Sequence, residues 1–428
     1  MVLTKNNKDL SFKSILYFCD IMKYYERIVE NEIKSKLTDE SIVDIIGPRE
    51  CGKTTVAGMF ANSTLSFNKN LESSRKLAEF KPELLLKGNK PLLIDDIEKL
   101  PVLKDVMVTS SKKIANNGLY ITTNSKTPTQ PVLMLPMSLY ESGDSTGAVK
   151  ILDLFKNPEL PIDGIESKLE LDELIAVTCR SGFPRAINNP DEIHEYVKRV
   201  MRDYVQDVNG IRRDFLKVQM ILQTYSKYVS TVEKNTRLLE TCQSLCPTIA
   251  KSTLYAYLND FRQMHVIREI PSWNIPVKSR TSIKTANKKA FCDPAIPAAV
   301  LNLTPDDLLF DLEYYEMLFK NLCVRDLQVY TSIAGGRIYH YSDRYDVNVD
   351  CVLELSNRDY ALINFNLSSH TLDDSIKNLK NVEKAILRKI EAGKLSINPP
   401  RFLAIITASH FAYAHKKGVK IIPIGVLR

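Results

Sequence analysis

The sequence predicts an α/β fold in which a mostly parallel β-sheet carries helices on both of its faces. Short apolar, β-prone runs alternate with longer segments whose apolar residues recur at helical spacing, as a parallel sheet with crossover helices requires. In addition, the β-prone run at 42–46 leads directly into a glycine-containing loop and then into a helical segment at 54–60. That order of strand, loop and helix is typical of phosphate-binding proteins.

The remaining elements follow in chain order. Three further strands are expected at 91–96, 118–124 and 132–137, and residues 14–37 and 170–225 are predicted to be mainly helical. Residues 248–266 are expected to form the second half of a helix-turn-helix, with a wing strand at 267–273. A basic stretch without acids, at 276–289, is the best linker candidate. Beyond it, helices near 311–324 and 372–391, with strands near 337–341, 350–355, 361–367, 402–407 and 419–423, predict a second α/β unit.

The loop at 47–54 has the spacing Gly-x4-Gly-Lys-Thr, which lets backbone N–H groups turn inward around phosphates at the start of a helix. We expect Lys53 to pair with the β- and γ-phosphates, and the Thr54 hydroxyl to ligate Mg²⁺. ATP and Mg²⁺ are therefore the predicted cofactors. The residues predicted to bind the nucleotide are Gly47, Pro48, Arg49, Glu50, Cys51, Gly52, Lys53, Thr54 and Thr55.

A second motif, Leu-Leu-Ile-Asp-Asp at 92–96, places two carboxylates at the end of an apolar strand. Asp95 is expected to reach the Mg²⁺ shell and Asp96 to orient or deprotonate the attacking water. Asp96 is one methylene shorter than the glutamate usual at this position, so its reach is reduced by roughly 1.5 Å. Because a general base must lie within hydrogen-bond reach of its water, we expect slow hydrolysis; Glu98 is an alternative base.

Polar residues also end the next strand, and Thr123 and Asn124 are candidates for contact with the γ-phosphate or its water; an ordinary turn is the alternative. The sequence Asn-Ser-Lys-Thr at 124–127 is not the guanine-reading Asn-Lys-x-Asp, which favours adenine. The break Ser-Gly-Phe-Pro-Arg at 181–185 is a candidate lid that would bring Pro184 and Arg185 to the nucleotide. A plain corner between helices would explain that break equally well.

Composition sets broad limits. The net charge of +7, from 58 basic and 51 acidic residues in 428, permits a nucleic-acid partner without arguing for one. Eight scattered cysteines, with no zinc-finger spacing, fit a reducing compartment. The polar first residues lack the apolar core of a signal peptide, and no run of about 18 apolar residues occurs. We therefore expect a cytoplasmic protein that makes no contact with a membrane.

Four segments resemble one known group, the bacterial and archaeal AAA-type ATPases that carry a C-terminal domain of unknown function. The similarity extends from about Tyr24 to Arg428. The loop matches the pattern Gly-Pro-(Arg/Lys)-x-Cys-Gly-Lys-Thr of that group, Cys51 included. The other three segments are Met-Leu-Pro-Met-Ser-Leu-Tyr-Glu-Ser-Gly at 134–143, Ser-Gly-Phe-Pro at 181–184 and Pro-Ile-Gly-Val-Leu-Arg at 423–428.

The resemblance implies a P-loop NTPase core at 1–165, a helical lid at 166–215, a winged-helix segment at 216–276, a basic linker at 277–290 and a restriction-endonuclease-like α/β domain at 291–428. The metal-binding pattern of such nucleases is not kept. The family's Phe-Glu, Glu-Val-Asp and Glu-Val-Lys fall on Phe319-Lys320, Asn348-Val349-Asp350 and Asn364-Phe365-Asn366. A lone carboxylate beside a lysine and amides predicts a structural or binding relic there.

Three functions therefore stand side by side. The first is a slow Mg²⁺-dependent ATPase that acts as a conformational switch on an unidentified protein partner. The second is a nucleic-acid-binding ATPase that holds DNA with the helix at 252–261 and the basic residues of the linker. The third, an active nuclease, is disfavoured by the altered metal pattern. The sequence leaves the oligomeric state open.

Overall fold

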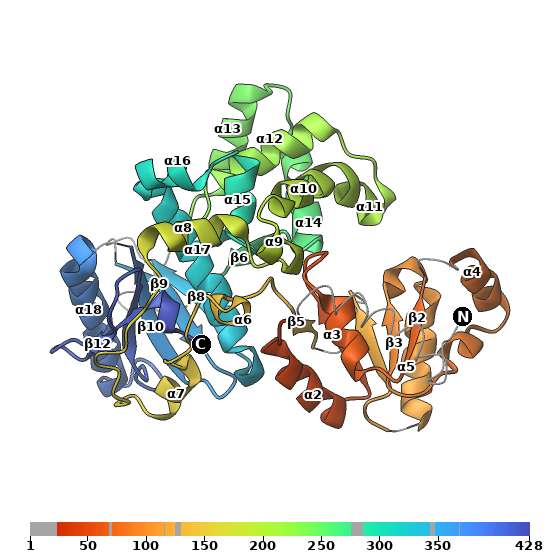
Figure 1. Cartoon of the computed structure of the whole chain (residues 1–428), viewed down its shortest axis with the longest axis horizontal. Helices are drawn as coiled ribbons and strands as arrows, with labels where there is room; N and C mark the ends of the chain where they lie inside the picture. The colour runs from red at the N-terminus through yellow and green to blue at the C-terminus, as the bar shows by residue number, and fades with distance from the viewer. Residues whose placement is uncertain are drawn as a thin grey trace. The chain divides into compact units, whose positions relative to one another are not determined.

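The chain divides into two units, Met1–Leu135 and Pro136–Arg428, in the computed structural model of the protein (Figure 1). The structure describes residues 24–67, 71–114, 116–124, 130–274, 286–342, 347–367 and 369–428. The start of the helix expected at 14–37 lies outside these ranges, as do residues 277–285 of the expected basic linker. The division after Leu135 differs from the ATPase core expected to extend to residue 165, because residues 146–151 pair with the C-terminal segment, as described below.

The first unit contains a parallel sheet with the strand order β2-β3-β4-β1-β5 over its described residues. This confirms the predicted parallel α/β architecture of the first unit. Its elements are α2 (Val29–Asp39), β1 (Ile42–Ile46), α3 (Lys53–Phe60), β2 (Ser63–Ser66), α4 (Leu71–Phe80), η1 (Pro82–Leu86), β3 (Leu92–Asp95), η2 (Ile97–Lys99), α5 (Val102–Ile114), β4 (Tyr120–Thr123) and β5 (Val132–Leu133).

Apolar side chains fix this sheet against its helices. Leu92 and Ile94 of β3 are buried in one cluster with Leu103 and Met107 of α5. The strands β1, β3 and β4 run parallel in register, with Ile42 and Leu92 both opposite Tyr120. Because parallel strands end at a common edge, β1 delivers the loop after Ile46 to the same edge that receives the carboxylates after β3.

The second unit begins with short helices and continues through a largely helical region. These elements are α6 (Leu139–Ser142), α7 (Ile151–Lys156), α8 (Leu171–Arg180), α9 (Pro184–Asn188), α10 (Glu192–Arg199), η3 (Val200–Tyr204), α11 (Val205–Asp207), η4 (Val208–Gly210), α12 (Phe215–Ser226), α13 (Asn235–Leu245), α14 (Lys251–Gln263) and β6 (Ile267–Ile270). The helix predicted inside 248–266 and the strand predicted after it are confirmed as α14 and β6.

The strand β7 (Lys288–Phe291) pairs antiparallel with β6. This corrects the prediction at one point, since Lys288 and Lys289 were placed in the linker at 277–290 and are instead buried strand residues. The reason is that both lysines have partners within the second unit. Lys288 pairs with Asp350, and the ammonium of Lys289 donates to the carbonyl of Glu233.

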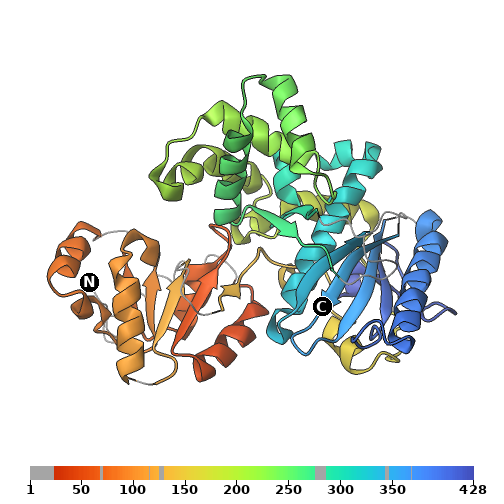
Figure 2. The ribbon, with the colours of Figure 1, turned by 180° about the vertical axis from the view of Figure 1, so that it is seen from behind.

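The C-terminal part of the second unit is built on a mixed sheet with the order β12-β13-β11-β10-β9-β8 over the described residues. Figure 2 shows α17 along one face of this sheet and α18 along the other. Its elements are α15 (Ala295–Val300), α16 (Pro305–Phe310), α17 (Leu312–Tyr330), η5 (Ser332–Ala334), β8 (Arg337–Ser342), β9 (Asn348–Glu354), β10 (Tyr360–Asn366), η6 (Ser369–Thr371), α18 (Leu372–Glu391), β11 (Leu403–Thr407), β12 (Tyr413–Ala414), β13 (Val419–Pro423) and η7 (Ile424–Val426).

The second unit closes on itself through its two ends. Val149 N donates to Val426 O and Ile151 N to Arg428 O, while Arg428 N donates back to Val149 O. The Ser145 hydroxyl donates to Leu427 O across a sequence separation of 282 residues. The segment at 146–151 is therefore an integral part of the second unit.

Among the helices that the structure describes, none combines the length and the apolar character that crossing a membrane requires.

Candidate functional site

The loop between β1 and α3 is shaped by two glycines. Gly52 caps α3 with φ of 102°, a left-handed conformation that glycine adopts without strain. Gly47 passes so close to Met134 that a Cβ on it would lie 2.0 Å from the Met134 carbonyl oxygen. The first glycine of the Gly-x4-Gly-Lys-Thr pattern is thus needed for a close approach between backbones, and the second for a turn.

Lys53 is the first residue of α3, and its side chain folds back over this loop. The ammonium donates to Gly47 O at 2.9 Å and to Pro48 O at 2.6 Å. The next two residues of the loop are Arg49, which is exposed, and Glu50, which has φ of 66°. Lys53 therefore places a positive charge inside the loop, where a phosphate group would interact with it directly.

Asp95 is the last residue of β3, and its carboxylate accepts hydrogen bonds from two hydroxyl groups. Thr54 Oγ1 donates to Asp95 Oδ1 at 2.9 Å, and Thr123 Oγ1 donates to the same oxygen at 3.0 Å. Burial raises the pKa of the Asp95 carboxyl, and the neighbouring charge of Asp96 raises it further. The site thus holds a carboxylate in a place where a cation would be a stronger partner than the hydroxyls.

The Thr123 hydroxyl also accepts a hydrogen bond from Asp96 N at 2.8 Å. Asp96 has φ of 54°, and its carboxylate forms an exposed ion pair with Lys99 at 3.0 Å. In Asn124, the backbone N–H donates to Ile45 O, while the side-chain oxygen is buried without a hydrogen-bond partner among the described atoms. The structure thus gathers Asp95, Asp96, Thr123 and Asn124 at one edge of the sheet.

Arg27 also supports the loop, although it was not expected from the sequence. This buried side chain precedes α2 and donates to Cys51 O at 3.0 Å and to Leu135 O at 2.6 Å. The Cys51 thiol is fully buried and lies 3.5 Å from Met134 O. Arg27 and Cys51 thus tie the loop to the strand end after β5, which gives Cys51 a structural role. Thr55, by contrast, is an exposed residue of α3.

Pro184 and Arg185 begin α9 in the second unit, and their predicted contact with the nucleotide remains a prediction. The break before them has a clear packing reason. A Cβ on Gly182 would lie 2.1 Å from Met137 O, and Met137 N donates to Gly182 O at 2.7 Å. The nearby Arg180 forms a two-point ion pair with Asp144.

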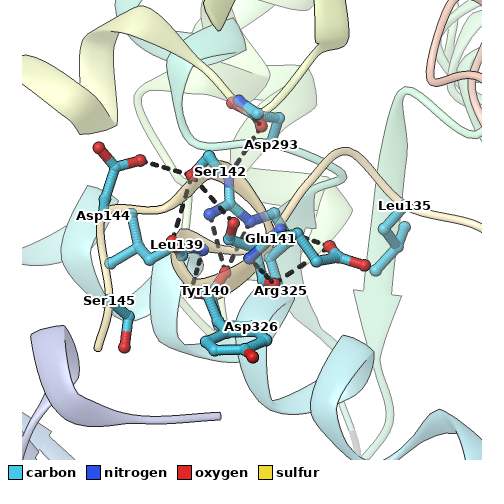
Figure 3. Close-up of polar contacts among 12 residues, drawn as sticks. Leu135, Leu139, Tyr140, Glu141, Ser142, Asp144, Ser145, Asp293, Arg325 and Asp326 are labelled. Carbon is cyan, nitrogen blue, oxygen red and sulfur yellow. Dashed lines mark hydrogen bonds and ion pairs between the residues drawn. The ribbon is translucent and has the colours of Figure 1, made fainter. Parts of the chain in front are cut away.

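A buried charge network surrounds the segment that follows Pro136 (Figure 3). Arg325 of α17 pairs with Asp293 at 2.9 Å and with Asp326 at 2.8 Å. Asp293 accepts from Gly182 N at 2.9 Å and Asp326 accepts from Leu139 N at 3.0 Å. One guanidinium between two carboxylates therefore fixes both the Gly182 break and the start of α6.

The start of α6 is further fixed by its own cap. The Ser138 hydroxyl accepts from Glu141 N, and the Glu141 carboxylate accepts from Ser138 N at 2.8 Å, which is a capping box. The capping box and the network at Asp326 thus give the segment Met-Ser-Leu-x-Glu-Ser a structural role.

In the C-terminal sheet, Asp350 of β9 is paired with Lys288 at 3.0 Å. Burial opposes the ionisation of Asp350, but the charges of Lys288 and Lys320 outweigh it and hold its pKa below the usual range. Asp350 also accepts from Phe365 N, and its own N–H donates to Asn364 Oδ1. Within the described ranges, no group of three or more His, Cys, Asp or Glu side chains could hold a metal ion.

The helix α14 presents a polar face to solvent. Its exposed residues are Lys251, Ser252, Tyr255 and Asn259. Tyr257 and Leu258 of the same helix are buried in the core. Two of the five basic residues predicted to support DNA binding, Lys288 and Lys289, lie in β7; Lys278, Arg280 and Lys284 are outside the described residues.

Part of the second unit matches a family model, and the chain is similar to two solved structures. Residues 171–307 match the model of a family described as a domain of unknown function, DUF8612. The chain is similar to the Walker-type ATPase PABY2304 of Pyrococcus abyssi, with 12% identity, coverage of 65% of this chain and 96% of that chain, and a TM-score of 0.40. It is also similar to Drosophila ORC in a DNA-bound structure, with 12% identity, coverage of 66% and 84%, and a TM-score of 0.20. No curated protein matches the chain.

Proposed function

We propose that the first unit binds ATP with Mg²⁺ through residues 47–54, and that slow hydrolysis makes the protein a conformational switch for an unidentified protein partner. One observation carries this proposal. The Thr54 hydroxyl and the Asp95 carboxylate lie 2.9 Å apart beside the Lys53 ammonium, at the start of a helix. Helix starts favour anions, and paired hydroxyl and carboxylate oxygens favour Mg²⁺.

The donor set fits both cofactors. Mg²⁺ prefers a small number of carboxylate and hydroxyl oxygens beside phosphates, and Thr54 and Asp95 would hold it. It would supply positive charge at the bound phosphates. Lys53 is held by two neutral carbonyls, which charged phosphate oxygens would replace with stronger partners. Pro184 and Arg185 are proposed to contact the nucleotide from the second unit.

Replacing Lys53 by alanine is expected to weaken Mg-ATP binding by about 100-fold or more, equivalent to about 2.7 kcal/mol. The reason is the loss of the charge inside the loop. Isothermal titration calorimetry of both proteins measures the effect. Lys113→Ala is the matched control, because Lys113 is an exposed lysine in the last turn of α5. Equal affinities for wild type and Lys53→Ala, or no binding by either, would contradict the proposal.

Replacing Asp96 by glutamate is expected to raise kcat for ATP hydrolysis by about tenfold or more, because the longer side chain regains reach toward the water. Asp96 is short, and its carboxylate is engaged by Lys99. A phosphate-release assay under saturating Mg-ATP measures the change, with Asp96→Asn as the variant that should lose residual turnover. Both variants should keep the wild-type affinity for ATP. An unchanged or lower kcat in Asp96→Glu would show that Asp96 does not limit hydrolysis.

A nucleic-acid-binding ATPase is the second candidate, and the exposed face of α14 favours it. Lysine can contact phosphates, tyrosine can stack on bases, and asparagine can pair with adenine, and all three types lie on this face. For the C-terminal sheet we propose a role without catalysis. The support is that the positive charges of Lys288 and Lys320 act on Asp350, the one carboxylate left of the nuclease pattern.

A further inference from the structure

A basic hollow of about 580 Å³ lies between η3 and the start of α12 in the second unit. This volume is in the range of sites that bind small groups or ligands. Three of the side chains around it are arginines, and one is a carboxylate. The lining residues that matter here are Arg202, Gln206, Arg212, Arg213, Asp214 and Phe215.

Two of the arginines keep their charge available. Arg202 and Arg212 are exposed, and neither forms an ion pair with a carboxylate within the described part of the chain. The Arg202 guanidinium lies 5.5 Å from the centre of the Phe215 ring, a contact that orients the group without neutralising it. The charge of Arg202 also acts on Glu195, but that carboxylate is paired with Lys198. An anion in the hollow would therefore meet two guanidinium groups that have no ion-pair partner of their own among the described residues.

The third arginine is held rigidly and anchors the loop. Arg213 Nε donates to Asp260 of α14 at 2.6 Å, and its guanidinium lies 4.9 Å from the centre of the Tyr257 ring. The Gln206 side chain donates to Arg213 O and accepts from Arg213 N, at 3.0 Å and 2.7 Å. The loop that carries Arg212 is thus fixed in place before any ligand arrives, which lowers the entropy cost of binding.

The carboxylate of Asp214 also lines the hollow, but its oxygens are directed to other groups and not to these arginines. Asp214 Oδ1 accepts from Leu216 N at 2.9 Å and from Lys217 N at 3.3 Å, which caps α12. Its second oxygen lies 3.9 Å from the Lys217 ammonium. The first N–H groups of α12 therefore already have an acceptor. An anion would be attracted to the hollow by the arginines.

A distorted helical turn presents Arg202 at this place. The segment η3 (Val200–Tyr204) is a single turn of π-helix between two α-helices. Such turns cost stability and occur frequently at functional sites, where they redirect a side chain. This observation is independent of the charge balance, and it also points to the hollow.

We propose that this hollow binds backbone phosphates of a nucleic acid, through Arg202 and Arg212. Guanidinium groups match phosphate oxygens in a planar, two-point geometry. The inference rests on the second candidate function and adds a second contact surface to it. The anchors Asp260 and Tyr257 belong to α14, so Arg213 links the hollow directly to the helix that carries the exposed face. From Asp260 back to Lys251 the helix axis measures about 13 Å, which is about four nucleotide steps of a duplex strand.

The test uses the full chain and fluorescein-labelled DNA of about 20 nucleotides, single-stranded and double-stranded, with anisotropy read at about 50 and 200 mM salt. The variant is Arg202→Gln with Arg212→Gln. The matched control is Arg237→Gln with Arg358→Gln, which removes the same charge from two exposed cations that already have carboxylate partners outside the hollow. Circular dichroism checks that both proteins remain folded.

The hollow variant is expected to bind DNA about tenfold or more weakly at the lower salt. Its plot of log affinity against log salt should also lose about two units of slope, since each phosphate contact contributes about 0.9. The control pair should match the wild type. Equal binding by the wild type and the hollow variant, or no binding by the wild type at the lower salt, would overturn the proposal.

Further arms separate this site from its alternatives. The variant Lys251→Gln with Tyr255→Ala tests the exposed face of α14. If only this variant loses DNA affinity, the protein binds nucleic acid through α14, and the proposal for the hollow is wrong. Polyglutamate that binds as tightly as DNA, with the same dependence on the two arginines, would assign the hollow to an acidic protein. Displacement of DNA by inorganic phosphate at matched ionic strength would assign it to a free anion. Loss of ATP binding in the hollow variant would place the arginines in the nucleotide site.

Discussion

Replacing Arg325 by methionine is expected to lower the free energy of unfolding of the second unit by about 3–5 kcal/mol. Methionine keeps most of the volume but leaves Asp293 and Asp326 as buried carboxylates without their cation. Arg325 is only 3% exposed, and its partners are 0% and 2% exposed. Water can therefore do little to compensate either carboxylate.

The single tryptophan makes this measurement specific. Trp273 is buried in the core cluster of the C-terminal sheet, so its fluorescence during urea denaturation reports the second unit alone. Arg358→Met is the matched control, because Arg358 is 79% exposed in its pair with Glu354, and exposed pairs contribute little. A midpoint for Arg325→Met equal to that of the control would show that the network does not stabilise the fold.

Replacing Gly47 by alanine is expected to weaken Mg-ATP binding by about 100-fold or more, equivalent to about 2.7 kcal/mol. The added methyl group would lie 2.0 Å from Met134 O, so the loop backbone must shift away from the strand end. That shift would misplace the N–H groups and the carbonyls that hold Lys53. Calorimetric titration with Mg-ATP measures the loss.

The chain offers a close control for this substitution. Gly58 lies in α3, a few residues beyond the loop, and a Cβ there would meet nothing within 4 Å. Gly58→Ala should bind ATP as the wild type does and gain about 0.5–1 kcal/mol of stability, as alanine does in a helix interior. Similar affinities for the two alanine variants would mean that the close approach at Gly47 does not position the loop.

Much of the first unit could be predicted because its elements are defined locally. The apolar runs of β1, β3 and β4 are bounded by turn residues, and the glycines of the loop mark its position. The strand β2 was missed, because among its residues Ser63–Ser66 only Leu65 is apolar. Its strand conformation comes from pairing with β3 at the sheet edge, which no local pattern indicates.

The residues that were missed or misplaced depend on partners distant in the sequence. Arg27 supports the loop through a carbonyl 108 residues away. In the sequence, Lys288 resembles an exposed linker lysine. In the fold it pairs with Asp350, which lies 62 residues further along the chain. A charged residue can be buried only with such a partner, and a single sequence does not show which charges meet. The carboxylates and hydroxyls at the edge of the first sheet were predictable because strand ends converge there.

The pairing of residues 146–151 with residues 424–428 sets an order for folding during synthesis. Contacts in the first unit join residues no more than about 110 positions apart, as with Arg27 and Leu135, so that unit can fold while the rest is being translated. The second unit cannot close until residue 428 has left the ribosome, since Arg428 N donates to Val149 O. Such distant pairing slows folding. Until it forms, residues 146–151 would remain accessible to chaperones and proteases.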